Sequence, residues 1–121
     1  MSSMEKSVRQ TRFAISDLQK RIEVLEATRA DLERQIRKLN ESVPEEEIEP
    51  TAEREGFVAY GSYAQSVIAR KSNIRKTLND ITEQTIGLSS DLRVALDALD
   101  SFERIRARQI AAKAEKALKR A

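Results

Sequence analysis

The side chains that could do chemistry in this sequence are carboxylates, ammonium and guanidinium groups, and a few hydroxyls. The chain has 20 Asp and Glu residues and 22 Lys and Arg residues, but no Cys and no His. Thiolate nucleophiles, imidazole general bases and Cys or His metal ligands are therefore excluded. Acids and bases on exposed helix faces form weak ion pairs and no pocket. We therefore expect a protein that is not an enzyme, with no catalytic residue, metal site or cofactor.

The charged residues are segregated along the chain. Seven acids and one base lie in residues 41–55, whereas seven bases and one acid lie in residues 104–121, and the net charge of +2 conceals this. Blocks of one sign decide which surfaces a protein contacts. We expect an acidic turn and a basic C-terminal end.

The elements that position these charges are predicted by two apolar heptad runs, which indicate two long helices. The a and d positions of the first run hold Met4, Val8, Thr11, Ile15, Leu18, Ile22, Leu25, Arg29, Leu32, Ile36, Leu39 and Val43. Those of the second run hold Phe57, Tyr60, Ala64, Val67, Lys71, Ile74, Leu78, Ile81, Thr85, Leu88, Leu92, Ala95, Leu99 and Phe102. Pro44 and Pro50 separate the runs.

The predicted fold is all-α: one domain formed by a long two-helix antiparallel coiled-coil hairpin with a C-terminal helical overhang. We expect helices over about 3–42 and 53–118 and a turn over about 43–52. A register in which facing position numbers add to 96 puts the axis of the hairpin in this turn and pairs Thr11 with Thr85. It leaves the 26 residues after Ala95 without a partner from the first helix.

This expected overhang combines bases with apolar residues, so it predicts a binding surface. The apolar stripe consists of Leu96, Leu99, Phe102, Ile105 and Ile110. Nucleic acid and anionic lipid are less favoured partners, because Phe102 is the only aromatic residue there and the chain has no glycine-rich phosphate loop. A protein partner is expected instead.

Two segments stand out in the second half of the chain: Tyr60-Gly61-Ser62-Tyr63, followed by Val67, and the stretch from Phe102 to Gln109 that leads into an Ala- and Lys-rich tail. They resemble a known family, the flagellar type III export protein FliJ and the related YscO-type injectisome stalk proteins. The resemblance covers mainly residues 57–121.

The resemblance implies a stalk that inserts its open coiled-coil end into the ring of a hexameric export ATPase and couples that ring to the export gate. It implies ATPase contacts at Leu99, Phe102, Arg104, Ile105, Arg106, Arg108 and Ile110. It implies contacts to the cytoplasmic domain of the gate at Tyr60, Tyr63, Val67 and Ile74. Export chaperones stay open as further partners.

The place of action follows from the same resemblance and from hydropathy. The N-terminus lacks an apolar signal core, and no stretch approaches the roughly 18 apolar residues of a membrane span. We expect a cytoplasmic protein, peripheral at the inner-membrane export apparatus, that serves protein export, flagellum biogenesis and motility without inserting into the membrane.

Two other functions compete with the stalk. One is a self-associating structural coiled-coil scaffold, which would be a dimer or bundle, whereas the hairpin predicts a monomer of 13.7 kDa. The other is a nucleic-acid-binding helical protein that uses residues 104–121 on phosphates.

Overall fold

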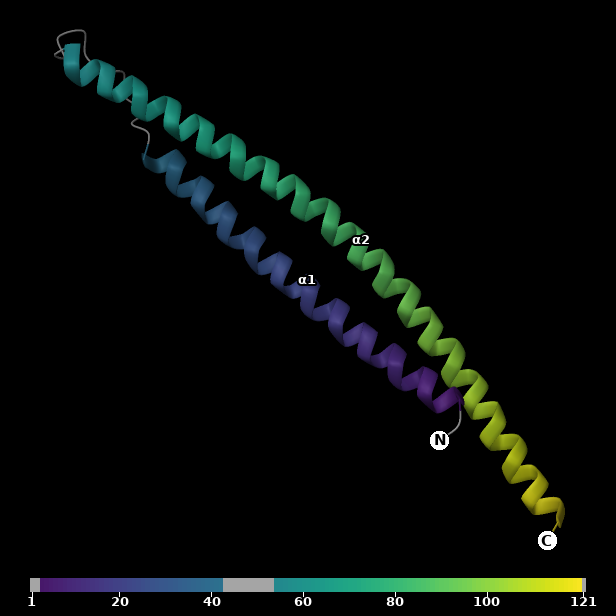
Figure 1. The fold of residues 1–121 in the computed structure, drawn as a ribbon. Coiled ribbons are helices and arrows are strands. Elements are labelled where there is room, and N and C mark those ends of the chain that lie inside the picture. Colours follow the sequence, from purple (N-terminus) through teal and green to yellow (C-terminus); the bar gives the residue numbers. More distant parts are fainter. Residues whose placement is uncertain (1–2, 43–53, 121) are drawn as a thin grey trace. The chain divides into compact units, whose positions relative to one another are not determined.

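The computed structural model describes the backbone of residues 3–42 and 54–120, and the side chains of residues 3–42 and 61–120. All of these residues are helical, in α1 (Ser3–Ser42) and α2 (Arg54–Arg120) (Figure 1). The protein is therefore all-helical over the described ranges. The acidic turn predicted for residues 43–52 lies outside them.

The bounds of both helices follow from where proline and glycine occur. Residues 3–42 contain neither, and Pro44 and Pro50 fall between the two helices. Gly56, Gly61 and Gly87 lie inside α2, and none has a positive φ. A glycine in a helix costs only about 1 kcal/mol relative to alanine, which long flanking segments can absorb. α2 therefore continues through all three positions.

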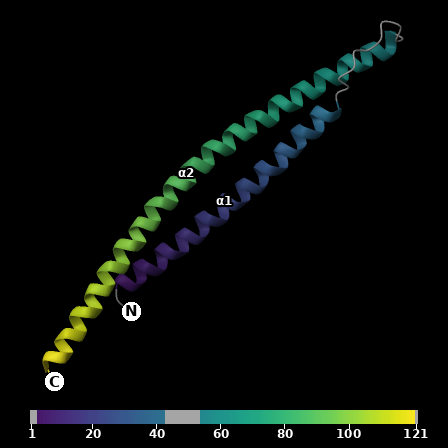
Figure 2. The ribbon, with the colours of Figure 1, turned by 180° about the vertical axis from the view of Figure 1, so that it is seen from behind.

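The chain divides into two compact units. Unit 1 comprises Met1–Val24 and Thr85–Ala121, and unit 2 comprises Leu25–Gln84. Within each unit a segment of α1 packs along a segment of α2 that runs in the opposite direction, as the views from the front and from behind both show (Figures 1 and 2). Each unit thus consists of two paired helical segments.

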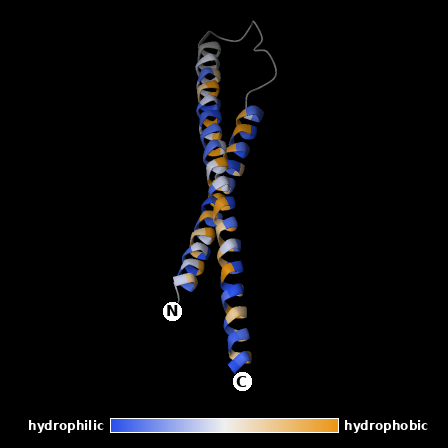
Figure 3. Ribbon diagram, turned by 90° about the vertical axis from the view of Figure 1, so that its right-hand side faces the viewer, coloured by the Kyte–Doolittle hydropathy of each residue, from blue (hydrophilic) through white to orange (hydrophobic). Residues whose placement is uncertain are grey.

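The burial of side chains follows the two heptad runs. Every predicted a or d residue whose side chain is described is buried or half-buried. The most deeply buried are Val8 and Ile15 in α1 and Val67, Ile74 and Ile81 in α2. Hydrophobic residues recur along both helices (Figure 3). The predicted seam residues whose side chains are described are confirmed as the less exposed positions of both helices, whereas Val43, Phe57 and Tyr60 lie outside the described side chains.

The predicted register, however, is wrong. In unit 1 Arg12 forms an ion pair with Glu103, and in unit 2 Arg29 Nη2 donates a 3.5 Å hydrogen bond to Thr82 Oγ1. The position numbers of these pairs add to 115 and 111, not to 96. A sum of 96 would place the partners about 22 to 28 Å apart along the helix axis, at 1.5 Å per residue. Each unit therefore has a register displaced by two to three heptads.

The observed register buries apolar surface near the C-terminal end of α2 that the predicted register left exposed. The observed register covers Leu99 and Phe102, which are half-buried, whereas the predicted register left both in water. Each Å² of apolar surface removed from water stabilises by about 25 cal/mol. The eleven residues between Ser42 and Arg54 could span up to about 36 Å, so a short symmetric turn is not imposed on the helices.

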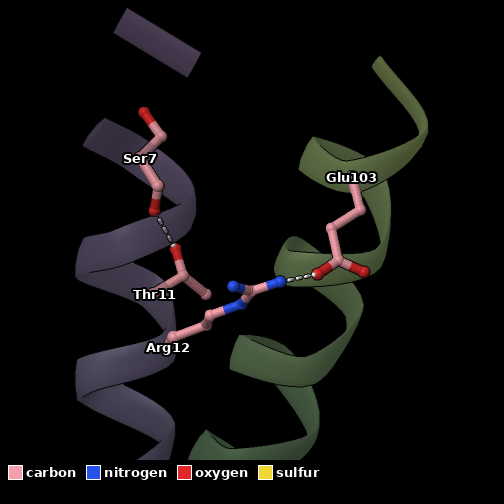
Figure 4. Close-up of polar contacts among 4 residues, drawn as sticks. All are labelled: Ser7, Thr11, Arg12 and Glu103. Atoms are coloured by element: carbon pink, nitrogen blue, oxygen red, sulfur yellow. Dashed lines mark hydrogen bonds and ion pairs between the residues drawn. The ribbon is translucent and has the colours of Figure 1, made fainter. Parts of the chain in front are cut away.

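The predicted pairing of Thr11 with Thr85 is also unnecessary. The Thr11 hydroxyl donates a 2.8 Å hydrogen bond to the Ser7 carbonyl, four residues earlier in the same helix (Figure 4). A half-buried hydroxyl satisfied within its own helix needs no polar residue opposite it. Matching polar seam positions was therefore not a valid criterion for the register.

Candidate interaction surfaces

In unit 1, α2 continues past the N-terminal part of α1 as an unpaired helix. Half-buried side chains end at Arg106, and every residue from Ala107 to Arg120 is exposed. We call residues 107–120 the basic end. The predicted overhang after Ala95 was thus too long, because the N-terminal part of α1 covers Leu99 and Phe102 and pairs with Glu103.

The basic end carries five bases and one acid. The bases are Arg108, Lys113, Lys116, Lys119 and Arg120, and the acid is Glu115. Lys119 Nζ lies 3.6 Å from Glu115 Oε1, one helical turn away, and both side chains are largely exposed. Such a pair contributes a few tenths of a kcal/mol at most. Four positive charges therefore remain uncompensated within the basic end itself.

The seven candidate ATPase contacts fall into two groups. Leu99, Phe102 and Arg106 are half-buried beside α1. Arg104, Ile105, Arg108 and Ile110 are exposed, with Ile110 at 62%. Arg104 is also paired with Asp100 at 3.0 Å, one turn earlier in α2. The exposed group is the part of the predicted site that a partner could contact directly.

The four candidate gate contacts do not form one exposed surface. Val67 and Ile74 have 4% and 7% of their surface accessible, so a partner cannot reach them while they are buried. Tyr63 is 46% exposed, and the side chain of Tyr60 lies outside the described residues. Ile68 is exposed too, but its heptad position puts it on the opposite flank of the seam from Tyr63. Of the described candidates, Tyr63 alone presents substantial surface.

A pocket in unit 2 was missed by the sequence analysis. It has a volume of about 310 Å³ and is lined by Gln35, Lys38, Leu39 and Arg70. Two cationic side chains and an amide suit a carboxylate or phosphate group. No sequence signal could have found it, because the predicted register places Gln35 level with Gly61 rather than near Arg70.

The described residues show neither a metal centre nor a membrane span. No group of three or more acidic side chains among them could hold a metal ion. Neither described helix is long and apolar enough to cross a membrane. The surfaces to consider are therefore the basic end, the region of Tyr63 and the pocket beside Arg70.

Comparison with known proteins adds no family. No family model matches the chain, and no curated protein or solved structure matches it either.

Proposed function

We propose that this protein is a non-enzymatic stalk or adaptor of a type III protein export apparatus of the flagellar kind, folded as an antiparallel coiled-coil hairpin. One observation carries the proposal: the basic end is a helix exposed along its whole length beyond the paired part of unit 1. The resemblance of residues 57–121 to the FliJ family supports the choice of a flagellar type III export apparatus as the system.

The proposed contact with the hexameric export ATPase is made by the exposed members of the candidate set. Arg104 and Arg108 supply positive charge, and Ile105 and Ile110 supply apolar surface. Leu99, Phe102 and Arg106 have a supporting role, because they hold this part of α2 against α1. A ring that receives this helix should be lined by acidic and apolar side chains.

Coupling to the export gate is proposed for the start of α2. Tyr63 offers an exposed aromatic ring with a hydroxyl, a side chain often enriched in protein interfaces. Val67 and Ile74 keep this helix packed in unit 2 and are assigned no direct contact.

Binding to the export ATPase of the same organism tests the proposal. The variant Arg108→Glu with Ile110→Asp should lose at least about tenfold in affinity, because it reverses the charge at position 108 and places a carboxylate at an apolar position of the proposed contact. A matched control is Arg93→Glu with Val94→Asp, which changes an exposed arginine and an exposed apolar residue elsewhere in unit 1. Absence of binding by the unaltered chain, or equal losses in both variants, would contradict the proposal.

A self-associating scaffold remains the second candidate, because apolar side chains away from the seam are exposed on both helices. In unit 1 these include Phe13 at 77%, and Ile86 and Val94 at 66% each. Sedimentation equilibrium separates the two functions. A mass of 13.7 kDa fits the monomeric stalk, and a multiple of it fits the scaffold.

A further inference from the structure

The basic end has two chemically different faces. At 100° per residue, one face of about 120° holds only Ala107, Ile110, Ala111, Ala114, Ala117 and Leu118. The remaining positions carry all five bases together with Gln109 and Glu115, and Ala112 is the one apolar residue among them. Hydrophobic and hydrophilic residues accordingly alternate toward the C-terminal end of α2 (Figure 3). The basic end is an amphipathic cationic helix.

Its apolar face is not a continuation of the seam. The heptad that places Leu99 and Phe102 against α1 continues through Arg106, Gln109, Lys113, Lys116 and Arg120. These seam positions are all polar, so α2 presents no apolar seam beyond Arg106, where the half-buried side chains end. The apolar residues are turned about a third of a turn away from that line. A different surface from α1 must therefore cover Ile110 and Leu118, which are 62% and 77% exposed.

The surface that fits must accept positive charge and apolar side chains along the same helix. Nucleic acid would neutralise the bases but leave Ile110 and Leu118 in water, and residues 107–120 contain no aromatic side chain for base stacking. An anionic bilayer accepts both, since headgroups attract the bases while the acyl boundary receives the apolar face. Clusters of four to eight bases on an amphipathic helix are typical of anionic lipid binding.

We infer that residues 107–120 bind the surface of anionic phospholipid bilayers, lying in the interface with Ile110 and Leu118 toward the acyl chains. The absence of further aromatic residues and of a glycine-rich loop, which favoured a protein partner from the sequence, does not argue against an anionic bilayer. The structure limits the uncovered part to residues 107–120, where the two faces separate cleanly. The inference is independent of the proposed export function, although both use Arg108 and Ile110, so lipid and ATPase should compete.

Co-sedimentation of the full chain with vesicles tests the inference. We expect binding to vesicles of phosphatidylcholine with one-third phosphatidylglycerol, little binding to phosphatidylcholine alone, and loss of binding as salt is raised to about 0.5 M. Ile110→Gln with Leu118→Gln should weaken binding at least about tenfold without changing charge. Ile86→Gln with Val94→Gln is the matched control, since both residues are 66% exposed and lie outside the basic end. It should bind like the unaltered chain.

A second measurement reports the orientation of the helix. The chain has no Trp, so a single introduced Trp is a clean fluorescence probe. Ala114→Trp, on the apolar face, should shift to shorter wavelength with anionic vesicles, whereas Ala112→Trp, on the polar face, should shift far less. Equal shifts, absence of vesicle binding, or equal losses in both Gln variants would overturn the inference. So would tight binding of duplex DNA that is unchanged in Ile110→Gln with Leu118→Gln, if the vesicles bind nothing.

Discussion

Arg12 Nη2 lies 2.7 Å from Glu103 Oε1, across the two helices of unit 1 (Figure 4). Both side chains are well exposed, at 57% and 39%, so the pair contributes little to stability. The ion pair is informative about the register instead, because it shows which residue near the start of α1 lies beside which residue near the end of α2. It establishes that the N-terminal part of α1 covers α2 as far as Arg106.

Disulfide trapping should distinguish the observed register from the one predicted by sequence. Ile15→Cys with Ala95→Cys joins two seam positions of unit 1 whose numbers add to 110, close to the sums of the observed contacts, and oxidation should close this bridge within one chain. Val8→Cys with Leu88→Cys joins two seam positions of unit 1 whose numbers add to 96, as in the predicted register, and should stay reduced. Because the chain has no native cysteine, mass spectrometry after mild oxidation reads each pair without background. Faster closure of the second pair would refute the observed register.

Phe102 and Ile105 should respond differently to substitution by aspartate. Phe102 is half-buried at a seam position, whereas Ile105 is 39% exposed beside the seam. Phe102→Asp should lower the free energy of unfolding by about 2 to 3 kcal/mol, because it removes apolar packing and places a carboxylate against α1. Ile105→Asp should cost under about 1 kcal/mol. Urea unfolding followed by circular dichroism measures both, and equal effects would mean that α1 does not cover Phe102.

The helices and their contact residues could be predicted from the sequence, whereas the register could not. Residues such as Val8 and Ile74 are assigned to the seam by heptad position alone, because the spacing of apolar residues is a property of each helix by itself. The register is a relation between helices, and shifts by whole heptads keep apolar opposite apolar. Registers that differ by whole heptads differ little in the apolar area that they bury. Here the difference includes the burial of Leu99 and Phe102, which the pairing of Thr11 with Thr85 could not reveal.

The error in register explains the errors at the C-terminal end of α2 and at the pocket beside Arg70. It placed Leu99 and Phe102 in the uncovered overhang, and it kept Gln35 away from Arg70. The exposure of Arg108 and Ile110 was anticipated correctly, because these residues lie beyond the end of α1 in either register. The predicted exposure of residues beyond the paired part of α2 did not depend on the register, whereas the predicted contacts between the two helices did.

Gly87 offers a test of helix propensity in α2. A Cβ atom built there meets nothing within 4 Å, and the residue has no positive φ. Gly87→Ala should therefore raise the free energy of unfolding by about 0.5 to 1 kcal/mol, through lower backbone entropy in the unfolded chain. Gly87→Val should give a smaller gain, since β-branched residues are poorer helix formers. Thermal melting should order the stabilities as Ala above Val above Gly, and a loss on Gly87→Ala would show that the helix needs glycine there.

Arg29 should be the seam position whose replacement stabilises the protein most directly. Its side chain is half-buried, and its hydrogen bond to Thr82 Oγ1 across unit 2 is at the 3.5 Å limit. Arg29→Leu should raise the free energy of unfolding by about 1 kcal/mol, because apolar contact replaces a poorly solvated guanidinium. The hydroxyl of Thr82 loses nothing, since it still donates a 3.0 Å hydrogen bond to the carbonyl of Leu78.

The same substitution should weaken the specificity of pairing, because a charge at a seam position penalises registers and assemblies that bury it more deeply. Arg29→Leu should therefore raise the melting temperature and also populate dimers, seen as a higher mass in sedimentation equilibrium. Arg34→Leu is the matched control: Arg34 is 56% exposed and paired only with Asp31 at 3.4 Å, so melting should change within about 0.5 kcal/mol. A less stable Arg29→Leu variant would show instead that the arginine stem packs better at this seam than leucine does.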